Sequence, residues 1–194
     1  ALAVSVVLHV ASLPAEARGW IPLIAGAAMT RAVSTQLLGT GNTAGLKWPN
    51  DVLVDGAKIC GILAEVVPGN PGTVVLGAGV NTRMSRADLP VSTAVSFEVL
   101  GIDSDDDGLL ADFLTHLDEQ LRALTALVGD AAASGVLGLV EALCTTLGHD
   151  VTVALPDGTH LSGRAQRLDA GGRLVVVDGD VGYAVSAGDV IHVR

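Results

Sequence analysis

A short polar segment, Lys47-Trp48-Pro49-Asn50-Asp51, combines a cation with residues that make rigid turns. Pro49 fixes its own φ and restricts Trp48 to an extended conformation. Asn50 and Asp51 can hydrogen-bond to nearby backbone groups and so hold the turn rigid. A lysine beside such a turn can meet a phosphate or a carboxylate with little reorganisation. The alternative is an exposed lysine at the end of a strand, because most lysines are solvated.

A second lysine begins the apolar stretch Lys58-Ile59-Cys60-Gly61-Ile62-Leu63. Asp55-Gly56, just before it, is a strong signal for a hairpin turn, so Lys58 and Asp51 fall on the two arms of one predicted hairpin. They could form an ion pair with each other, or they could share a phosphate and its metal ion. Gly61 inside a strand of bulky residues indicates a bulge or a ligand that lies against the backbone.

A third segment, Gly77-Ala78-Gly79-Val80-Asn81, places two glycines two positions apart. Residues with this spacing face the same side of a strand, so Gly77 and Gly79 would open a flat slot for a planar ligand. The amide of Asn81 would lie at the edge of that slot. The segment is not the dinucleotide-binding fingerprint, because no helix with a third glycine follows. A second backbone that crosses the strand closely is the alternative explanation for the glycines.

The histidines and cysteines predict neither a nucleophile nor a metal site. The five histidines are dispersed without ligand spacing, and we assign them no role. Cys60 and Cys144 lie in apolar runs, so we expect buried free thiols, which suit a reducing cytoplasm.

The composition is typical of a folded, acidic protein. The 194 residues suffice for one ordinary domain and a small one, and a hydrophobic fraction of 49% can build a large core. A formal net charge of −10 repels the phosphate backbone and argues against nucleic-acid partners. The apolar stretch Ala1–Val10 has no basic start and is too short to span a bilayer, so we predict a buried strand there and no membrane association.

Hydrophobic patterning predicts the elements that would position the polar segments. A strand at Leu2–Val10 precedes a helix at Trp20–Leu38, and further strands follow at Leu46–Trp48, Val52–Val54, Ile59–Val67 and Val74–Val80. The short turns between these strands imply a mixed or antiparallel sheet rather than a doubly wound parallel one.

Two more helices are predicted before the pattern changes from helical periodicity to short strands. The first follows the acidic residues 103–107, and its apolar face is expected to pack in the core; that face comprises Leu110, Phe113, Leu114, Leu117, Leu121, Leu124 and Val128. A shorter, looser helix is expected at Ala131–Leu147.

Five short strands are expected after Gly148, in fewer than 50 residues. They are predicted at Val151–Leu155, His160–Leu168, Arg173–Asp178, Gly182–Val185 and Val190–Val193, with a turn at Pro156-Asp157-Gly158. This density of strands indicates a small β-barrel domain, with a boundary near Leu147–Gly148.

The three polar segments together resemble the biotin–protein ligases. The resemblance rests on Lys-Trp-Pro-Asn-Asp, on Lys-x-x-Gly-Ile-Leu beginning seven residues after the aspartate, and on Gly-x-Gly-x-Asn. The tail Val185–Arg194 is also similar to the end of that family's C-terminal domain. The resemblance implies an α/β (α+β) fold: a mixed, largely antiparallel sheet with helices, similar to class II aminoacyl-tRNA synthetases, over residues 1–147. A small SH3-like β-barrel would follow over residues 148–194.

The resemblance also implies an activity. Members of the family join biotin to ATP, with Mg²⁺, to form biotinyl-AMP and pyrophosphate. They then pass biotin to a lysine on the biotin carboxyl carrier domain of an acyl-CoA or pyruvate carboxylase in the cytoplasm. By this resemblance Lys47 and Lys58 are the catalytic residues, Lys47 contacting the biotin carboxylate and the α-phosphate and Lys58 binding phosphate oxygens. The remaining roles fall to Asn50, Asp51 and Asn81 near the nucleotide or Mg²⁺, and to Gly61, Gly77 and Gly79 along the biotin slot.

Part of the family's pattern lies upstream of Leu2 and is not in this sequence, namely a Ser/Thr-Thr-Asn segment and a Gly-Arg-Gly-Arg loop. We therefore expect residues 1–194 by themselves to bind biotin weakly. No DNA-binding helix-turn-helix pattern occurs, so a repressor function has no support. Two alternatives remain open: a lipoate–protein ligase-like enzyme, and a truncated, non-catalytic protein that binds biotin or a carrier domain.

Overall fold

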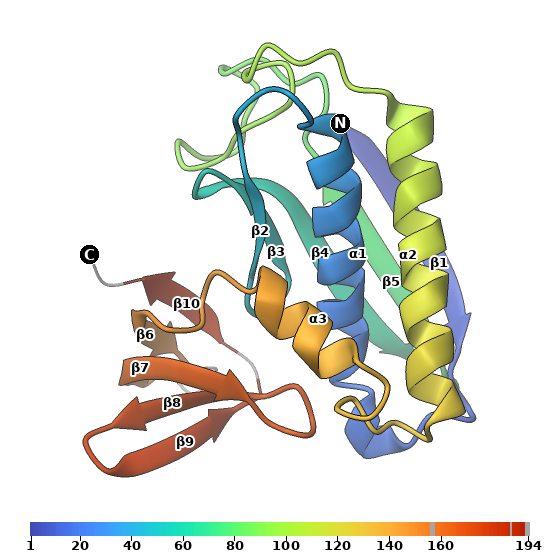
Figure 1. Ribbon diagram of the computed structural model, residues 1–194, viewed down its shortest axis with the longest axis vertical. Helices are drawn as coiled ribbons and strands as arrows, with labels where there is room; N and C mark the ends of the chain where they lie inside the picture. The colour runs from blue at the N-terminus through green and yellow to red at the C-terminus, as the bar shows by residue number, and fades with distance from the viewer. Residues whose placement is uncertain (156–157, 187, 193–194) are drawn as a thin grey trace.

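The computed structural model describes residues 1–155, 158–186 and 188–192, and this part of the chain forms two five-stranded sheets and three α-helices. Figure 1 shows the larger sheet behind the helices and the C-terminal sheet beside its lower end. No helix in the described ranges is long and apolar enough to cross a membrane.

The larger sheet has the strand order β1-β5-β4-β3-β2, and every neighbouring pair is antiparallel. Its strands are β1 (Leu2–His9), β2 (Ala44–Lys47), β3 (Asp51–Val54), β4 (Ala57–Val67) and β5 (Asn70–Val80). The predicted hairpin is present between β3 and β4, where Asp55 and Gly56 have φ values of 48° and 82°. Positive φ at both central residues is the geometry of the two-residue hairpin turn that Asp-Gly favours. The largely antiparallel sheet predicted from the short turns is confirmed.

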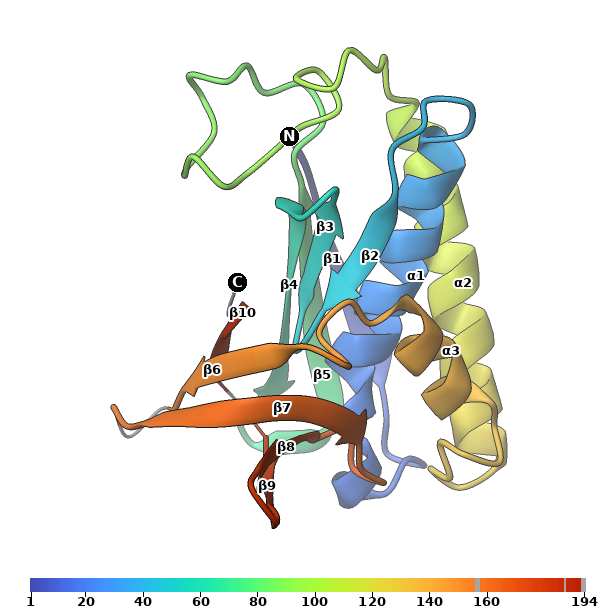
Figure 2. The same ribbon diagram turned by 60° about the vertical axis from the view of Figure 1, so that its left-hand side comes forward.

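The helices all cover one face of this sheet, and the other face carries none of them (Figure 2). They are α1 (Trp20–Gln36), α2 (Asp106–Ala126) and α3 (Val136–Leu143), with a short 3-10 helix, η1, at Ala15–Ala17. Asp105 caps α2, its carboxylate accepting a hydrogen bond of 3.0 Å from the backbone N–H of Gly108. The acidic start expected for this helix is therefore confirmed.

Two details of the predicted helical core are wrong. In α2 the buried stripe is Leu109, Phe113, Leu117 and Leu124, whereas the Leu114 and Val128 side chains are exposed. Leu114 stands one position from Phe113, which turns it by about 100° around the helix axis. Val128 lies beyond the end of the helix with a φ of 53°. The third helix is also shorter than expected, since residues 131–135 form turns before it begins.

The first strand is not buried, contrary to the prediction. Its burial alternates along Leu2–His9 between half-buried and exposed residues, because β1 is the edge strand of the sheet. Leu2, Val4, Val6 and Leu8 pack against the core, whereas residues of the opposite face, such as Val7, point to solvent.

The C-terminal sheet has the order β10-β6-β7-β8-β9, with antiparallel neighbours. Its strands are β6 (Asp150–Ala154), β7 (His160–Leu168), β8 (Leu174–Asp178), β9 (Val181–Val185) and β10 (Asp189–His192). The five predicted strands are present, but the described residues form an open sheet with β9 and β10 at its edges. The predicted turn at Pro156-Asp157, and Ala187, Val193 and Arg194 of the tail, lie outside the described residues.

Two tryptophans fasten the C-terminal sheet to the rest of the molecule. The indole N–H of Trp20 donates to the carbonyl of Ala170 at 2.8 Å, and that of Trp48 donates to the carbonyl of Gly172 at 3.2 Å. Both acceptors belong to the turn between β7 and β8. The carboxylate of Asp169 stiffens this turn by accepting from the backbone N–H groups of Gly171 and Arg173. The C-terminal sheet is therefore fixed relative to the segment that carries Lys47.

Candidate active site

A single row across the larger sheet brings together residues that are far apart in the sequence. Lys47 on β2 stands opposite Asp51 on β3, Asp51 opposite Gly61 on β4, and Gly61 opposite Gly79 on β5. Ala3 on β1 completes the row opposite Gly79. Residues that are directly opposite in antiparallel strands direct their side chains to the same face. The row thus has two charged residues at one end and a floor without side chains in the middle.

The neighbouring row shows which face this is. Leu46, Val52, Cys60 and Val80 are paired in the same way and are fully buried under the helices. Because alternate residues of a strand face opposite sides, the row with Lys47 belongs to the helix-free face. In Figure 2 strand β10 stands on that side of the sheet, away from the helices.

The glycines leave real space on this face. A methyl group built at Gly79 would meet no atom within 4 Å, and one at Gly77 would meet only the carbonyl of Leu63 at 4.0 Å. No backbone of the described ranges crosses the strand closely here, so within this part of the chain the alternative explanation for the pair is wrong. At Gly61 the nearest atoms are Cε and Nζ of Lys58, at 3.3 Å, which are the far end of a flexible side chain. The sheet surface beside the lysines is open to a flat ligand.

Hydrogen bonds hold the turn that follows Lys47. The backbone N–H of Trp48 donates to Oγ1 of the buried Thr146 at 3.0 Å, and the Trp48–Pro49 peptide is cis. The Asn50 amide donates to the carbonyl of Ile62 at 2.6 Å, and the N–H of Ile62 donates back to the carbonyl of Asn50 at 3.0 Å. The turn is thus tied to β4 on one side and to the segment before β6 on the other, as the rigid-turn interpretation requires.

Both lysines of the sequence lie at this site, and each has a carboxylate partner. Lys58 Nζ is 2.6 Å from Asp51 Oδ1, so the predicted hairpin pair exists. Lys47 Nζ is 3.7 Å from Oδ1 of Asp189, which comes from the C-terminal sheet. A cavity of about 450 Å³ lies between them, and its lining includes both pairs together with Asn50 and Gly61.

The other predicted residues stand around this cavity rather than in its wall. Gly79 is the next residue of the row after Gly61, and Gly77 is two residue pairs further along β4 and β5, opposite Leu63. The amide of Asn81 donates to the carbonyl of Val95 at 3.0 Å, so it ties down the loop between β5 and α2. Sequence reasoning missed Asp189 as a site residue, although the similarity of the tail to a known family was a signal that could have found it.

Neither cysteine contributes a nucleophile. Cys60 and Cys144 are both buried and free, as predicted. Burial, and to a smaller extent the carboxylate of Asp51, raise the pKa of the Cys60 thiol to about 12. Burial also raises the pKa of Cys144. Both thiols therefore stay protonated near neutral pH and behave as small apolar side chains.

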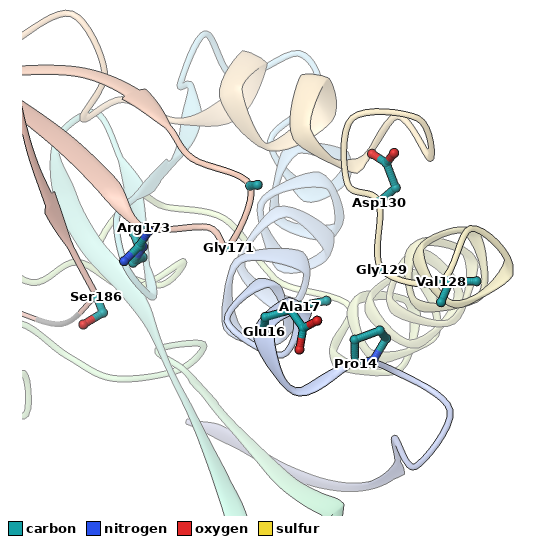
Figure 3. Close-up of a pocket in the computed structure, with 10 residues that line it drawn as sticks. Pro14, Glu16, Ala17, Val128, Gly129, Asp130, Gly171, Arg173 and Ser186 are labelled. Carbon is teal, nitrogen blue, oxygen red and sulfur yellow. The ribbon is translucent and has the colours of Figure 1, made fainter.

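A larger hollow, of about 740 Å³, lies elsewhere, between η1, the loop after α2 and the C-terminal sheet. Figure 3 shows Arg173 and Ser186 on one side of it and Pro14, Ala17 and Gly129 on the other. The Arg173 guanidinium is paired with Asp169 at 2.6 Å. The smaller cavity is the better candidate, because it gathers four charged side chains beside an open floor.

Comparisons with known protein sequences find ligases. The model of the Biotin/lipoate A/B protein ligase family matches residues 1–81. A biotin–[acetyl-CoA-carboxylase] ligase from Mycobacterium tuberculosis is 36% identical over 98% of this chain and 68% of its own length. The bifunctional ligase/repressor BirA of Escherichia coli is 28% identical over 68% of this chain and 40% of its own length. The chain thus spans about two thirds of the first relative and less than half of the second.

Solved structures share the fold. The crystal structure of a biotin protein ligase from Aquifex aeolicus has a TM-score of 0.79 and 21% identity, covering 99% of this chain and 81% of that one. The same Aquifex protein in complex with biotin and ATP has a TM-score of 0.77 and 21% identity, covering 100% of this chain and 78% of that one. At this identity the likeness shows a common architecture.

Proposed function

This chain belongs to the biotin protein ligases of the biotin/lipoate A/B protein ligase family, and we propose from that membership that it activates biotin with ATP and attaches it to a carrier protein. The first product would be biotinyl-AMP, with release of pyrophosphate. The second step would pass the biotin to a lysine of a biotin carboxyl carrier domain. The observation that carries the proposal is the row in which Lys47 and Asp51 continue into the open floor of Gly61 and Gly79.

The proposed chemistry explains why two lysines lie at the end of the glycine row. In the first step a carboxylate oxygen of biotin bonds to the α-phosphorus of ATP, and the bond from that phosphorus to the bridging oxygen of the β-phosphate breaks. Two anions must meet, and negative charge builds on the oxygens around the α-phosphorus and on the pyrophosphate that leaves. Lys47, fixed by its turn, would contact the biotin carboxylate and the α-phosphate, and Lys58 would bind phosphate oxygens. Charged groups that are already in place lower the cost of that encounter.

The glycines would take the non-reacting part of biotin. A flat bicyclic ligand can approach the strands at Gly61, Gly77 and Gly79, because no side chain projects there. In the second step the carrier lysine attacks the carbonyl of the mixed anhydride, and AMP leaves. That carbonyl is already activated, so positioning is the main requirement.

The nucleotide side of the site is assigned to Asn50, Asp51 and Asn81. Mg²⁺ is commonly held by one or two carboxylates together with substrate phosphates. Asp51 fits this role, since its Oδ1 is used by Lys58 and its Oδ2 could bind the ion. Bound Mg²⁺ would neutralise part of the triphosphate charge. Asn50 and Asn81 hold the two segments that border the nucleotide.

We assign residues 1–147 to a catalytic domain and residues 148–194 to a C-terminal SH3-like domain. The helices on one face of an antiparallel sheet support a catalytic domain similar to class II aminoacyl-tRNA synthetases. The short strands of the C-terminal sheet support the second assignment. The acceptor would be the carrier domain of an acyl-CoA or pyruvate carboxylase, and free thiols at Cys60 and Cys144 suit a cytoplasmic enzyme.

Pyrophosphate release tests the proposal directly. The protein is incubated with ATP, Mg²⁺ and either biotin or lipoate, and pyrophosphate is measured with and without a carrier domain. Release with biotin, together with biotinylation of the carrier, supports the proposal. Release with lipoate alone identifies a lipoate–protein ligase-like enzyme instead. Biotin binding without pyrophosphate release identifies a non-catalytic binding protein.

Lys47→Ala and Arg83→Ala separate a catalytic cation from a structural one. Arg83 lies outside the cavity, where it contacts Asp106 at 3.5 Å and the carbonyl of Ser104 at 3.3 Å. Loss of one preorganised charge-stabilising donor typically costs about 10²–10³ in rate, so Lys47→Ala should lose that much. Arg83→Ala should retain most of the activity. Equal, small losses in the two variants would return Lys47 to the status of an exposed lysine at a strand end.

A further inference from the structure

The cavity at the end of the glycine row is electrically balanced. Its lining holds two cations, Lys47 and Lys58, and two carboxylates, Asp51 and Asp189. A site that receives a carboxylate and a triphosphate should instead present positive charge, because like charges repel an approaching anion. We therefore expect an arriving anion to separate one of the two ion pairs and to take the place of its carboxylate.

The two ion pairs differ in how readily they can separate. Lys58 and Asp51 are 2.6 Å apart, and only 19% of the Asp51 side chain is exposed. Lys47 and Asp189 are 3.7 Å apart, and 79% of the Asp189 side chain is exposed. A carboxylate that is already largely hydrated loses little when it returns fully to water. Asp189 is accordingly the partner that an incoming anion can displace.

The C-terminal sheet holds Asp189 at this place. Strand β10 pairs with β6, with Asp189 opposite Ala154. Gly188 fits closely there, since a Cβ at that position would lie 2.6 Å from Cγ1 of Val153 and 2.8 Å from the carbonyl of Ala154. The Trp48 indole, one residue from Lys47, is bonded to the turn between β7 and β8 of the same sheet. The C-terminal sheet thus makes two contacts with the segment that carries Lys47: the hydrogen bond from the Trp48 indole and the ion pair between Lys47 and Asp189.

We propose that Asp189 is a specificity-determining residue that competes with the anionic substrate for Lys47. The inference rests on the proposed function and deepens it. In the free protein Asp189 neutralises Lys47 and so weakens the binding of stray anions. A ligand whose carboxylate binds Lys47 and whose ring system packs on the glycine floor displaces Asp189. A small inorganic anion binds less tightly, because it makes the first contact without the second.

Asp189→Asn tests the competition, because it keeps the shape of the side chain and removes its charge. Asp180→Asn is the matched control, an exposed aspartate on the same sheet in the turn before β9. Calorimetric titrations of the full chain with biotin, its uncharged primary amide and inorganic pyrophosphate are compared at about 20 mM and about 500 mM NaCl, where the screening lengths differ severalfold.

We expect Asp189→Asn to bind biotin and pyrophosphate about 1.5- to 5-fold more tightly at low salt, the range that exposed ion pairs span. Pyrophosphate should gain at least as much as biotin, the biotin amide should be unaffected, and the difference should shrink at high salt. Asp180→Asn should behave like the unmodified protein. Unchanged or weaker anion binding by Asp189→Asn, or an equal change with the amide, would overturn the inference.

A second measurement does not depend on biotin. Because Lys47 and Lys58 are the lysines of this sequence, reductive ¹³C-methylation gives few NMR signals while it keeps the charges. Asp189→Asn and pyrophosphate should both move the Lys47 signal in the same direction. If these signals respond as expected but biotin does not bind, the proposed function fails and the inference about Asp189 stands. If biotin binds but the Lys47 signal is the same in both variants, the inference fails and the function stands.

Discussion

Gly79→Ala should raise the free energy of unfolding of the protein and weaken its binding of biotin. A methyl group at this position meets no atom within 4 Å, so the folded state accommodates it without strain. A glycine inside a strand costs roughly 0.5–1 kcal/mol relative to alanine, because it loses more backbone freedom on folding. The free energy of unfolding should therefore rise by up to about 1 kcal/mol, which corresponds to a Tm increase of about 1–4 °C for a chain of this size.

The same methyl group would project into the slot proposed for biotin. Forcing one extra methyl into a close contact typically costs about 1–3 kcal/mol, so biotin should bind about 5- to 150-fold more weakly. The assay pairs thermal unfolding with a biotin titration. Gly163→Ala is the structural control, because its methyl would collide with the carbonyl of Val177 and approach Cγ1 of Val176 to 2.9 Å. That variant should lose stability.

The reasoning has a clear point of failure. If Gly79→Ala lowers the Tm by several degrees, the space beside this glycine is not free in the folded protein. If it raises the Tm but leaves biotin affinity unchanged, the ligand does not lie on the glycine floor.

Three further predictions concern the framework. Burial acts to raise the pKa of the Asp169 carboxyl, but hydrogen bonds from Arg173 and Gly171 outweigh it, so this pKa is lowered from 3.8. The contribution of Asp169 to stability is therefore present above pH 3.8 and is lost as the pH falls through the lowered pKa. The Tm gap between the unmodified protein and Asp169→Asn should accordingly close in acid, and a gap independent of pH would contradict the assignment. Phe113→Ala should cost about 3–5 kcal/mol in urea unfolding and Leu114→Ala less than about 1 kcal/mol, because only the first side chain is fully buried. A thiol reagent at pH 8 should label Cys60 far more slowly in the folded protein than in urea, since the pKa of this thiol is raised to about 12; equal rates would show that the thiol is accessible.

Much of the local structure could be predicted because its causes are local. Asp55-Gly56 specifies a two-residue hairpin through the backbone angles of those two residues alone, and the strands on either side appear where expected. The helix face of α2 was predicted less well. Periodicity shows that one face is apolar, but the packing partner decides which residues of a broad stripe become buried. In α2 the packing partner buries Leu109 and leaves Leu114 exposed.

The polar segments had a clear chemical meaning in the sequence, but their relative positions did not. The spacing of Lys47, Lys58 and the glycines predicted cations beside a slot, and the pair between Lys58 and Asp51 was one of two outcomes left open. The structure shows that the pair exists. Only the tertiary structure of the described residues excludes a close backbone crossing at Gly77 and Gly79, since the space around a glycine depends on every neighbour in the fold.

The sequence by itself determined the hairpin turn at Asp55-Gly56, the positions of most strands and the family to which the three polar segments belong. Those features depend on the chemistry of a few adjacent residues. Only the tertiary structure decided that Lys47, Asp51, Gly61 and Gly79 share one row, because strand register results from packing summed over the whole sheet. It also decided that Asp189 reaches Lys47, a contact between residues 142 positions apart that depends on how the C-terminal sheet docks.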